Sequence, residues 1–278
     1  LKTYIKNLKT LRKKFLGVFF NYSAKIIIMK FKSKLRYLFF KAFPERYIKL
    51  FNRSYDHKLN HNLLNLLKKG LKIDVIFDIG AFRGEWSKLL NKTSLKNKNF
   101  YLFEANEENR EFLKRSGFKY FFNVLSDKKK EVEFFSRVST GDSYLVEQTS
   151  FYKDDIKPIL KETVSLDEVI EKEKLPFPDF MKIDTQGSEL DILKGAQKCT
   201  SKCSLLYLEC PVIEYNLKAP NLNEYISYLN SINFVPLDVC EVHKIDNILI
   251  QIDVLFIKKN ILNKIYPRKK ILNILNSN

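Results

Sequence analysis

Hydrophobic and polar residues follow one another in a repeating rhythm of short apolar runs and longer amphipathic segments. Short apolar runs, typical of strands buried on both faces of a parallel sheet, occur at 75–79, 99–104, 178–184 and 204–209. Segments with apolar residues at helical spacing follow several of them, at 105–117, 188–196 and 221–231. This alternation predicts an α/β fold, with helices on both faces of a mostly parallel sheet.

Further elements complete the predicted sheet. A third strand is expected at 118–126, a small exposed strand at 131–136, and a final pair at 233–240 and 248–259. Phe112 and Leu113 are expected to face the core, as are the residues of a helical stripe, Trp86, Leu89 and Leu90. Asn106 is a predicted helix cap, and Asn221 with Glu224 has the spacing of a capping box.

The formal net charge of +17 belongs to the two ends of the chain. Residues 1–58 hold 16 Lys and Arg against two acidic residues, whereas the part between the ends is mildly acidic. We therefore expect a basic helical arm at 1–58, one domain at 59–260 and a basic tail at 261–278. The arm suits an anionic membrane surface, or packing on the domain or on a second subunit. The central domain lacks the charge pattern of a polyanion-binding surface.

The composition, with 45% hydrophobic and 29% charged residues, is typical of a folded globular protein. No stretch approaches the roughly 18 apolar residues that span a membrane, and no secretory signal pattern is evident. A cytoplasmic location is therefore expected, with peripheral membrane contact as an addition. Four cysteines without C-x-x-C spacing and three scattered histidines indicate reduced thiols and no zinc site.

Residues 75–87, VIFDIGAFRGEWS, indicate a strand, a glycine turn and the start of a helix. A dinucleotide-binding turn has the spacing G-x-G-x-x-G, whose second glycine lets a pyrophosphate approach the backbone. Phe82 occupies that position, and Asp78, Gly80 and Gly84 give D-x-G-x-x-x-G instead. A carboxylate here repels phosphate and attracts cations such as the sulfonium and ammonium groups of S-adenosylmethionine. A helix-capping aspartate is the structural alternative.

Acidic residues lie at or just after the ends of the predicted strands: Asp78, Glu104, Asp127, Asp184 and Glu209. Ligands of open α/β sheets bind outside the carboxyl ends of the strands, so these carboxylates are predicted to line one site. Glu104 lies 20 residues beyond Gly84, the usual place for a carboxylate that accepts both ribose hydroxyls. Ser126 and Asp127 are candidates for the adenine edge, with a plain turn as the alternative.

Six segments occur in this order: FDIGAFRGEWS, FEANEENREFL, NVLSD, SLDEVI, FMKIDTQGSELDILKGA and LLYLECP. In these segments, over about residues 73–258, the chain resembles the FkbM family of S-adenosylmethionine-dependent methyltransferases. KIDTQGSELDILKGA is the specific element, since many methyltransferases share the first motif. The resemblance implies a seven-stranded Rossmann-like, doubly wound sheet with a reversed last strand. It also implies O-methylation of a hydroxyl, often on a sugar or polyketide.

Two positions depart from the family's usual motifs. Phe82 stands where a small or amide residue is usual, and Ala105 where proline is usual; both changes leave the acidic residues in place. The candidate cofactor-binding residues are Asp78, Gly80, Ala81, Gly84, Glu104, Ala105, Ser126, Asp127 and Asp184.

Methyl transfer to a hydroxyl needs positioned reactants and a base. Asp184 is the first candidate base, since its strand adjoins the first strand in this class of sheet. Lys182 shares its strand face and, if buried, must pair with Asp184 or Glu209, or orient the acceptor oxygen. Glu209 is a candidate for acceptor binding, and Glu189 for a helix-dipole or catalytic role. His243, expected in a loop before the last strand, is a candidate base, with an exposed loop histidine as the favoured alternative.

The sequence requires no metal ion, although a divalent ion held by Asp184 and Glu209 stays an alternative. The expected acceptor is a hydroxyl of a glycan or lipid-linked saccharide, followed by a small polyketide or peptide product. An RNA methyltransferase is the first rival, but the turn at 184–187 reads DTQG rather than the D/N-P-P-Y/F that holds a flipped base. A nicotinamide-dependent oxidoreductase and a non-catalytic domain that docks through its arm are the other rivals.

Overall fold

A computed structural model describes residues 58–136, 141–148, 157–269 and 272. The chain divides into two units, 1–54 and 55–278, and the described residues all belong to the second. The predicted basic arm therefore lies outside the described residues, except for Lys58. None of the helices among the described residues combines the length and the apolar character that a membrane span requires.

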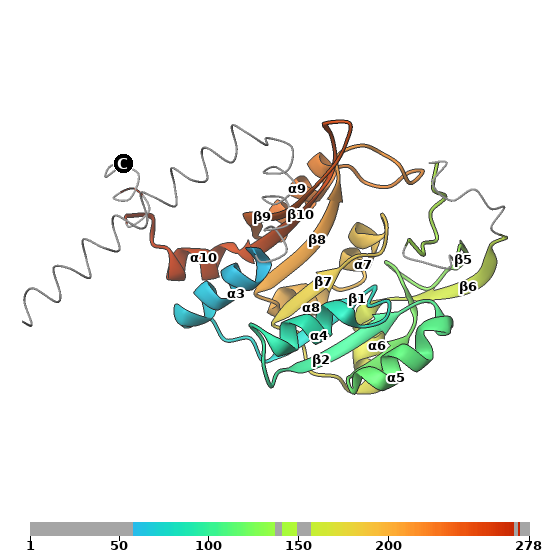
Figure 1. The fold of residues 1–278 in the computed structure, drawn as a ribbon, viewed down its shortest axis with the longest axis horizontal. Helices are drawn as coiled ribbons and strands as arrows, with labels where there is room; N and C mark the ends of the chain where they lie inside the picture. The colour runs from blue at the N-terminus through green and yellow to red at the C-terminus, as the bar shows by residue number, and fades with distance from the viewer. Residues whose placement is uncertain (1–57, 137–140, 149–156, 270–271, 273–278) are drawn as a thin grey trace, which may run out of the picture. The chain divides into compact units, whose positions relative to one another are not determined.

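Seven strands form one sheet in the order β3-β2-β1-β7-β8-β10-β9 (Figure 1). Their bounds are β1 (Val75–Ile79), β2 (Asn99–Glu104), β3 (Lys119–Phe122), β7 (Phe180–Ile183), β8 (Leu205–Pro211), β9 (Phe234–Ile245) and β10 (Ile248–Lys258). The strands from β3 to β8 are parallel, whereas β10 runs antiparallel to both of its neighbours. This topology confirms the expected Rossmann-like, doubly wound sheet with a reversed last strand.

Helices cover both faces of the sheet. Their bounds are α3 (Lys58–Lys68), α4 (Glu85–Lys92), α5 (Arg110–Ser116), α6 (Leu166–Glu173), α7 (Glu189–Lys194), α8 (Gln197–Lys202), α9 (Leu222–Ser231) and α10 (Lys259–Ile265). Apolar side chains of α3, α4, α5 and α10 belong to one buried cluster, and those of α6 to α9 belong to a second cluster on the other face. Successive strand residues alternate between the two clusters, as Ile76 and Phe77 do.

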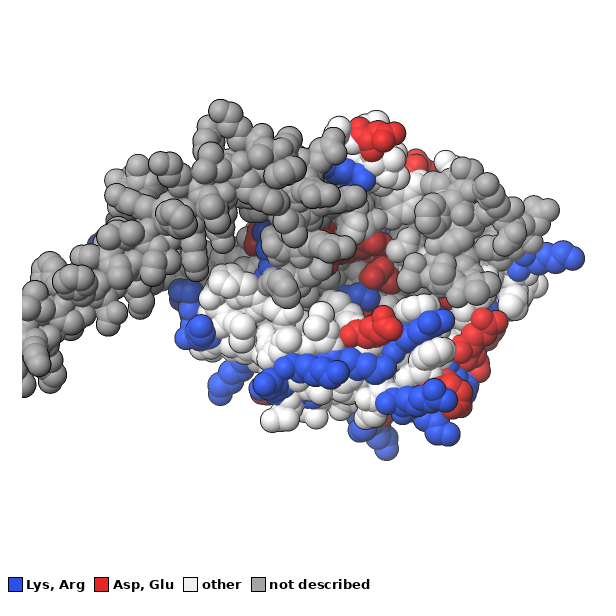
Figure 2. All heavy atoms as spheres, in the orientation of Figure 1, with Lys and Arg blue, Asp and Glu red and all other residues white. Residues whose placement is uncertain are grey.

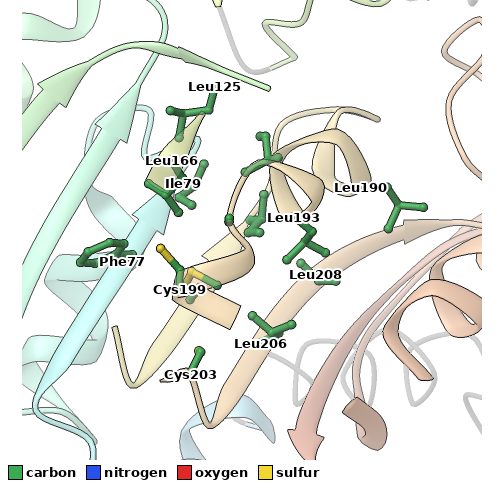
Figure 3. Packing of buried hydrophobic residues seen from close by; sticks show 14 of the residues in the cluster. Phe77, Ile79, Leu125, Leu166, Leu190, Leu193, Cys199, Cys203, Leu206 and Leu208 are labelled. Atoms are coloured by element: carbon green, nitrogen blue, oxygen red, sulfur yellow. The ribbon is translucent and has the colours of Figure 1, made fainter. Parts of the chain in front are cut away.

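The second cluster brings apolar side chains of strands and helices together (Figure 3). Phe77 of β1 and Leu206 of β8 contribute from the sheet, and Leu193 of α7 and Cys199 of α8 from the helices. All four of the chain's cysteines are buried and unpaired. Burial raises the pKa of the Cys203 thiol to about 12, so it behaves as a small apolar side chain.

The segment 118–126, predicted as one strand, is divided between two sheets. β3 forms an edge of the large sheet, whereas β4 (Val124–Leu125) pairs with β6 (Ile159–Val164) in a small sheet that also contains β5 (Glu131–Phe134). β5 confirms the predicted exposed strand. β6 was not predicted, because its sequence ILKETV exposes Ile159 and Leu160 and buries Thr163 and therefore lacks a clear apolar face.

Two helix residues that were expected in the core lie at the surface. Leu89 is 49% exposed and Phe112 is 40% exposed, whereas Leu90 and Leu113 are buried as predicted. The guanidinium of Arg83 covers the Phe112 ring at 4.3 Å from its centroid. This cation–π contact explains how an aromatic side chain is tolerated on the solvent side of α5.

Both predicted helix caps are present. The side chain of Asn106 accepts the backbone N–H of Glu108 at the start of the 3₁₀-helix η2 (Glu107–Asn109). Asn221 and Glu224 form a complete capping box at α9. The segment that was assigned to the basic tail begins inside α10, where apolar side chains pack against the first buried cluster.

A buried lysine joins β1 to β7 beneath the carboxyl edge of the sheet. Lys182 is the neighbour of Asp78 in the strand register. Its Nζ lies 3.3 Å from Asp78 Oδ1 and 3.2 Å from Asp184 Oδ2, and it donates to the Gly80 carbonyl at 3.0 Å. We expected Lys182 to pair with Asp184 or Glu209; it pairs with Asp184 and with Asp78.

The two buried charges depend on each other. Burial raises the pKa of Asp78, against the charge of Lys182 and a 2.6 Å hydrogen bond from Ser87. Burial acts to lower the pKa of Lys182, but the charges of Asp184 and Asp78 outweigh it, and the pKa rises. Lys182 is therefore held as a cation, and without it the pKa of Asp78 would rise further.

We predict that Lys182→Met lowers the free energy of unfolding by about 3–5 kcal/mol, because it leaves a buried carboxylate without its counter-ion. Adding Asp78→Asn to this variant is expected to restore part of the loss, since it removes the orphaned charge. Urea unfolding followed by circular dichroism measures both changes.

Lys172→Met is the matched control, because Lys172 is exposed on α6. Its effect is expected to stay within about 0.5 kcal/mol. A loss in Lys182→Met no larger than that in Lys172→Met would contradict the structural role of the buried pair.

Candidate functional site

A pocket of about 300 Å³ lies at the carboxyl edge of the sheet. It is lined by the turn after β1, the end of β2, the strand β4, residues 141–144 and the turn after β7. This volume is at the lower end of the range for small-molecule sites. The pocket lies where the acidic residues at the strand ends had led us to expect a site.

The charge of the pocket wall is negative. Among the described residues that line it are Glu104, Asp142, Asp184 and Glu209, and no Lys, Arg or His. Figure 2 shows acidic side chains in the hollow at the middle of the molecule, with basic side chains spread over the lower part of the same face. A wall of this kind favours a positively charged ligand and disfavours phosphate.

The turn after β1 is shaped by close contacts and backbone strain. Gly80 has φ 71°, and a Cβ at this position would lie 1.8 Å from the carbonyl oxygen of Asp184. Only glycine therefore lets the turn reach β7. Phe82 also has a positive φ, 50°, which is unfavourable for an aromatic residue, and its N–H donates to Glu104 Oε2 at 2.6 Å. Such strain is commonly found at binding sites.

Glu104 at the end of β2 accepts three backbone N–H groups. The donors are Phe82, Ala105 at 3.0 Å and Asn106 at 2.8 Å. Burial raises the pKa of Glu104 to about 7, and the nearby charge of Asp142 adds to the rise, while the backbone donors oppose it. A carboxylate on the pocket wall therefore titrates close to neutral pH.

Several predicted cofactor-binding residues do not line the pocket. Asp78 is fully buried beneath the Gly80 turn, and Ala81 is also buried. Ser126 is buried, with its hydroxyl 3.2 Å from that of Tyr144, which does line the pocket. Asp127 forms an ion pair with Lys130 at 2.8 Å. Gly84 is the N-cap of α4, with φ 71°. Their assignment to the cofactor stays a prediction.

Two of the predicted catalytic residues are joined by an amide. Nε2 of Gln186 donates to Glu209 Oε2 at 2.7 Å and to Asp184 Oδ1 at 3.3 Å. Gln186 has a positive φ of 57°. Its backbone carbonyl accepts hydrogen bonds from the Ser143 hydroxyl at 3.1 Å and from Nδ2 of Asn216 at 2.9 Å. Gln186 thus ties three separate segments together at the pocket wall.

Glu209 is half-buried and lies among other carboxylates. Burial raises its pKa well above the usual range, and the charges of Asp184, Asp253 and Glu189 raise it further. Its Oε1 accepts a short hydrogen bond from Gln251. Glu209 therefore binds a proton more readily than an exposed glutamate does.

Glu189 supports the turn after β7 from inside the protein. It is fully buried and accepts the N–H groups of Thr185 at 2.8 Å and Gly187 at 3.0 Å, together with the hydroxyl of Tyr225. Both carboxylate oxygens are thereby occupied. Glu189 holds the strained turn at Gln186 in place.

The predicted position of His243 is wrong: it lies within β9 and not in a loop. β9 continues to Ile245 and turns back through Asp246 and Asn247, both with positive φ, 47° and 66°. Asp and Asn at these positions are typical of a two-residue hairpin turn, a signal that the sequence contained. The side chain of His243 is 47% exposed and does not line the pocket.

The sequence pointed to no role for residues 141–148, although Asp142, Ser143 and Tyr144 line the pocket. An isolated bridge pairs Phe135 with Ser143. Asn106, the predicted cap, donates to Asp142 at 2.9 Å. A Gly-Asp pair is the single turn signal in this segment, and it has no periodic apolar pattern that would have indicated its position.

The family described as "Methyltransferase FkbM domain" matches residues 78–236. Among curated proteins, none matches. The solved structures that resemble this chain include the methyltransferase FkbM from Methylobacillus flagellatus KT, with 19% identity and a TM-score of 0.43. That match covers 66% of this chain and 45% of the other, so the chain spans less than half of that relative's length.

Two further structures are similar at lower scores. Precorrin-6y C5,15-methyltransferase from Geobacter metallireducens GS-15 has 14% identity, with 70% of this chain and 85% of the other covered and a TM-score of 0.38. TrmK of M. capricolum in complex with S-adenosyl-homocysteine has 14% identity, with 71% and 67% covered and a TM-score of 0.37. The family match covers more than half of the 278 residues and includes every turn that shapes the pocket wall from β1 to β8. The chain belongs to the methyltransferase FkbM domain family.

Proposed function

We propose that the protein is an S-adenosylmethionine-dependent methyltransferase that methylates a hydroxyl of a glycan, a lipid-linked saccharide or a related natural product. The observation that carries the proposal is the pocket wall, which holds four carboxylates and, among its described residues, no basic side chain. S-adenosylmethionine carries a sulfonium and an ammonium group but no phosphate, whereas NAD carries a pyrophosphate. Membership of the family supports the reaction class.

The residues of the pocket fit this cofactor. The carboxylate of Glu104 faces the pocket and, when ionised, can accept the two hydroxyls of a ribose. Gly80 brings the first turn against the end of β7. We assign the adenosyl end of the ligand to the side of Glu104 on β2 and its charged end to the side of Asp184. When bound, S-adenosylmethionine supplies a methyl group on a positively charged sulfur. The protein's own contribution is to orient the reactants and accept a proton.

The proton acceptor that the structure favours is Glu209. The Asp184 carboxylate, the first candidate from the sequence, is already engaged by the Lys182 ammonium at 3.2 Å. Glu209 has no basic partner of this kind among the described residues, and its pKa is raised by burial and by neighbouring carboxylates. A raised pKa makes a carboxylate a better base for a hydroxyl near neutral pH. We assign positioning to Asp184 and Lys182, and proton transfer to Glu209.

A nucleic-acid acceptor is less compatible with this site. The acceptor would approach Asp184 and Glu209, and a phosphate backbone beside these carboxylates would be repelled. A saccharide hydroxyl, by contrast, donates a hydrogen bond to a carboxylate without bringing negative charge.

Calorimetric titration of the purified protein with S-adenosylhomocysteine, and separately with NAD, tests the cofactor assignment. We expect the first to bind and the second not to bind. Glu104→Gln should weaken the affinity for S-adenosylhomocysteine by roughly 10-fold or more, as expected for loss of a charged hydrogen-bond partner. Glu108→Gln is the control, because Glu108 is exposed on η2. Binding of NAD in preference to S-adenosylhomocysteine would contradict the proposal.

The pKa of Glu104 predicts a pH dependence of cofactor binding. Only the ionised carboxylate accepts both ribose hydroxyls, and its pKa is about 7 in the protein. The affinity for S-adenosylhomocysteine should therefore rise with pH, by up to about tenfold between pH 6 and pH 8, and level off above that. Titrations in Glu104→Gln should be independent of pH over this range. An equal slope in the variant would show that another group is responsible.

Glu209→Gln should lower the rate of methyl transfer by about 10²- to 10⁴-fold, the usual contribution of a general base. The affinity for S-adenosylhomocysteine should change little, since Glu209 lies toward β10, away from Glu104. The rate is measured with radiolabelled S-adenosylmethionine and the best acceptor from a screen of hydroxylated saccharides. Asp184→Asn is the comparison: if it abolishes transfer while Glu209→Gln keeps most of the rate, Asp184 is the base.

A further inference from the structure

A row of acidic side chains continues beyond the pocket across three adjacent strands. Glu209 on β8 lies opposite Asp253 on β10, and Asp253 lies opposite Glu241 on β9. Side chains that are directly opposite in antiparallel strands point to the same face, with Cβ atoms about 4.5–5.5 Å apart. Like charges in such positions repel one another, so this row is stabilised by any cation that binds there.

His243 lies at the outer end of the row. It is two residues from Glu241 on the same strand and therefore on the same face. Its Nε2 is 3.4 Å from Asp253 Oδ1 and 3.8 Å from Glu241 Oε2. Both distances are longer than the roughly 2.7–3.2 Å of an ordinary N–H···O hydrogen bond. The three groups thus face one another across a small gap.

The spacing of these three atoms corresponds to that of ligands around a metal ion. Zinc binds imidazole nitrogen and carboxylate oxygen at about 2.0–2.2 Å, which places two ligands of a tetrahedral site about 3.4 Å apart. One imidazole–carboxylate separation in the cluster is 3.4 Å, the other is 3.8 Å, and all ligand atoms lie within 4.8 Å of one another. Only small side-chain movements separate this arrangement from a coordination sphere.

Tyr207 on β8 lies between the outer oxygens of the two carboxylates and can donate its one proton to either of them. Its hydroxyl lies 3.2 Å from Asp253 Oδ2 and 3.3 Å from Glu241 Oε1, which leaves Oδ1 and Oε2 facing His243. Hydrogen bonds to the far oxygen orient carboxylates that ligate metals. Gln251 donates to Asp253 Oδ1 at 3.3 Å and also to Glu209 in the pocket wall, so the cluster is linked to the pocket through one side chain.

We propose that Glu241, His243 and Asp253 bind a divalent transition-metal cation. One imidazole and two carboxylates suit Zn²⁺ and Mn²⁺ better than Mg²⁺ or Ca²⁺, which prefer oxygen ligands alone. Three protein ligands leave coordination positions for water, and the half-exposed imidazole gives the ion access from solvent. The cation offsets the repulsion along the acidic row. The site is separate from the pocket carboxylates and does not depend on the reaction proposed above.

Calorimetric titration of the full chain, after treatment with a chelator, with ZnCl₂ and separately with MnCl₂ tests the proposal. We expect one equivalent of metal to bind. His243→Ala and Asp253→Asn should each weaken binding by at least about 100-fold, and Tyr207→Phe by about 10- to 100-fold, the usual effect of removing an orienting partner. Circular dichroism and S-adenosylhomocysteine titration show whether each variant keeps its fold and pocket.

His61→Ala is the matched control, since His61 is an exposed histidine on α3. It should bind metal as the unchanged protein does. The Mn²⁺ titration separates the cluster from the four cysteines, because thiolates select Zn²⁺ over Mn²⁺. Absence of binding by both metals, or binding that His243→Ala and Asp253→Asn retain, would overturn the proposal.

Discussion

The ammonium group of Lys182 fixes the geometry of the carboxyl edge. It contacts a carboxylate on β1, a carboxylate after β7 and the carbonyl of the first glycine turn. Lys182 and Asp78 are both buried, and each would be costly without the other. The position of the turn after β1 relative to the end of β7 therefore depends on this one side chain.

Two turns that line the pocket, after β1 and after β7, have a strained backbone, and a buried glutamate stabilises each of them. Glu104 accepts the N–H of Phe82, and Glu189 accepts the N–H groups on either side of Gln186. Phe82 and Gln186 both have positive φ values, which are unfavourable without such support. The strained backbone turns these two side chains into positions that a relaxed turn would not reach. Each glutamate stabilises its turn through hydrogen bonds from the backbone.

The central sheet and the strand-end carboxylates could be predicted from the sequence, because buried parallel strands leave continuous apolar runs. Glu104, Asp184 and Glu209 line the pocket as their places at strand ends indicated. The reversed strand β10 was expected from family resemblance and not from local pattern.

Other features depend on the arrangement of strands, which local sequence does not encode. The pairing of Lys182 with Asp78 follows from the register between β1 and β7. The division of 118–126 between two sheets can be predicted only if the position of β6 is known. The exposed apolar residues of β6 obscure the alternation of apolar and polar residues that marks a strand. Residues 141–148 reach the pocket through single hydrogen bonds to distant segments, and such contacts leave no periodic signal.

Residues 141–148 contribute to the pocket wall but not to the hydrophobic core of the fold. Ser143 bonds the Gln186 carbonyl, Leu145 lies against Gly187, and Glu147 forms an isolated bridge with Asn216. None of the side chains in this stretch contributes to either apolar cluster. Asn106 also donates to Asp142, so this part of the pocket wall is held by contacts with several separate segments. Substitutions in this stretch therefore change the chemistry of the pocket wall while both apolar clusters of the fold stay intact.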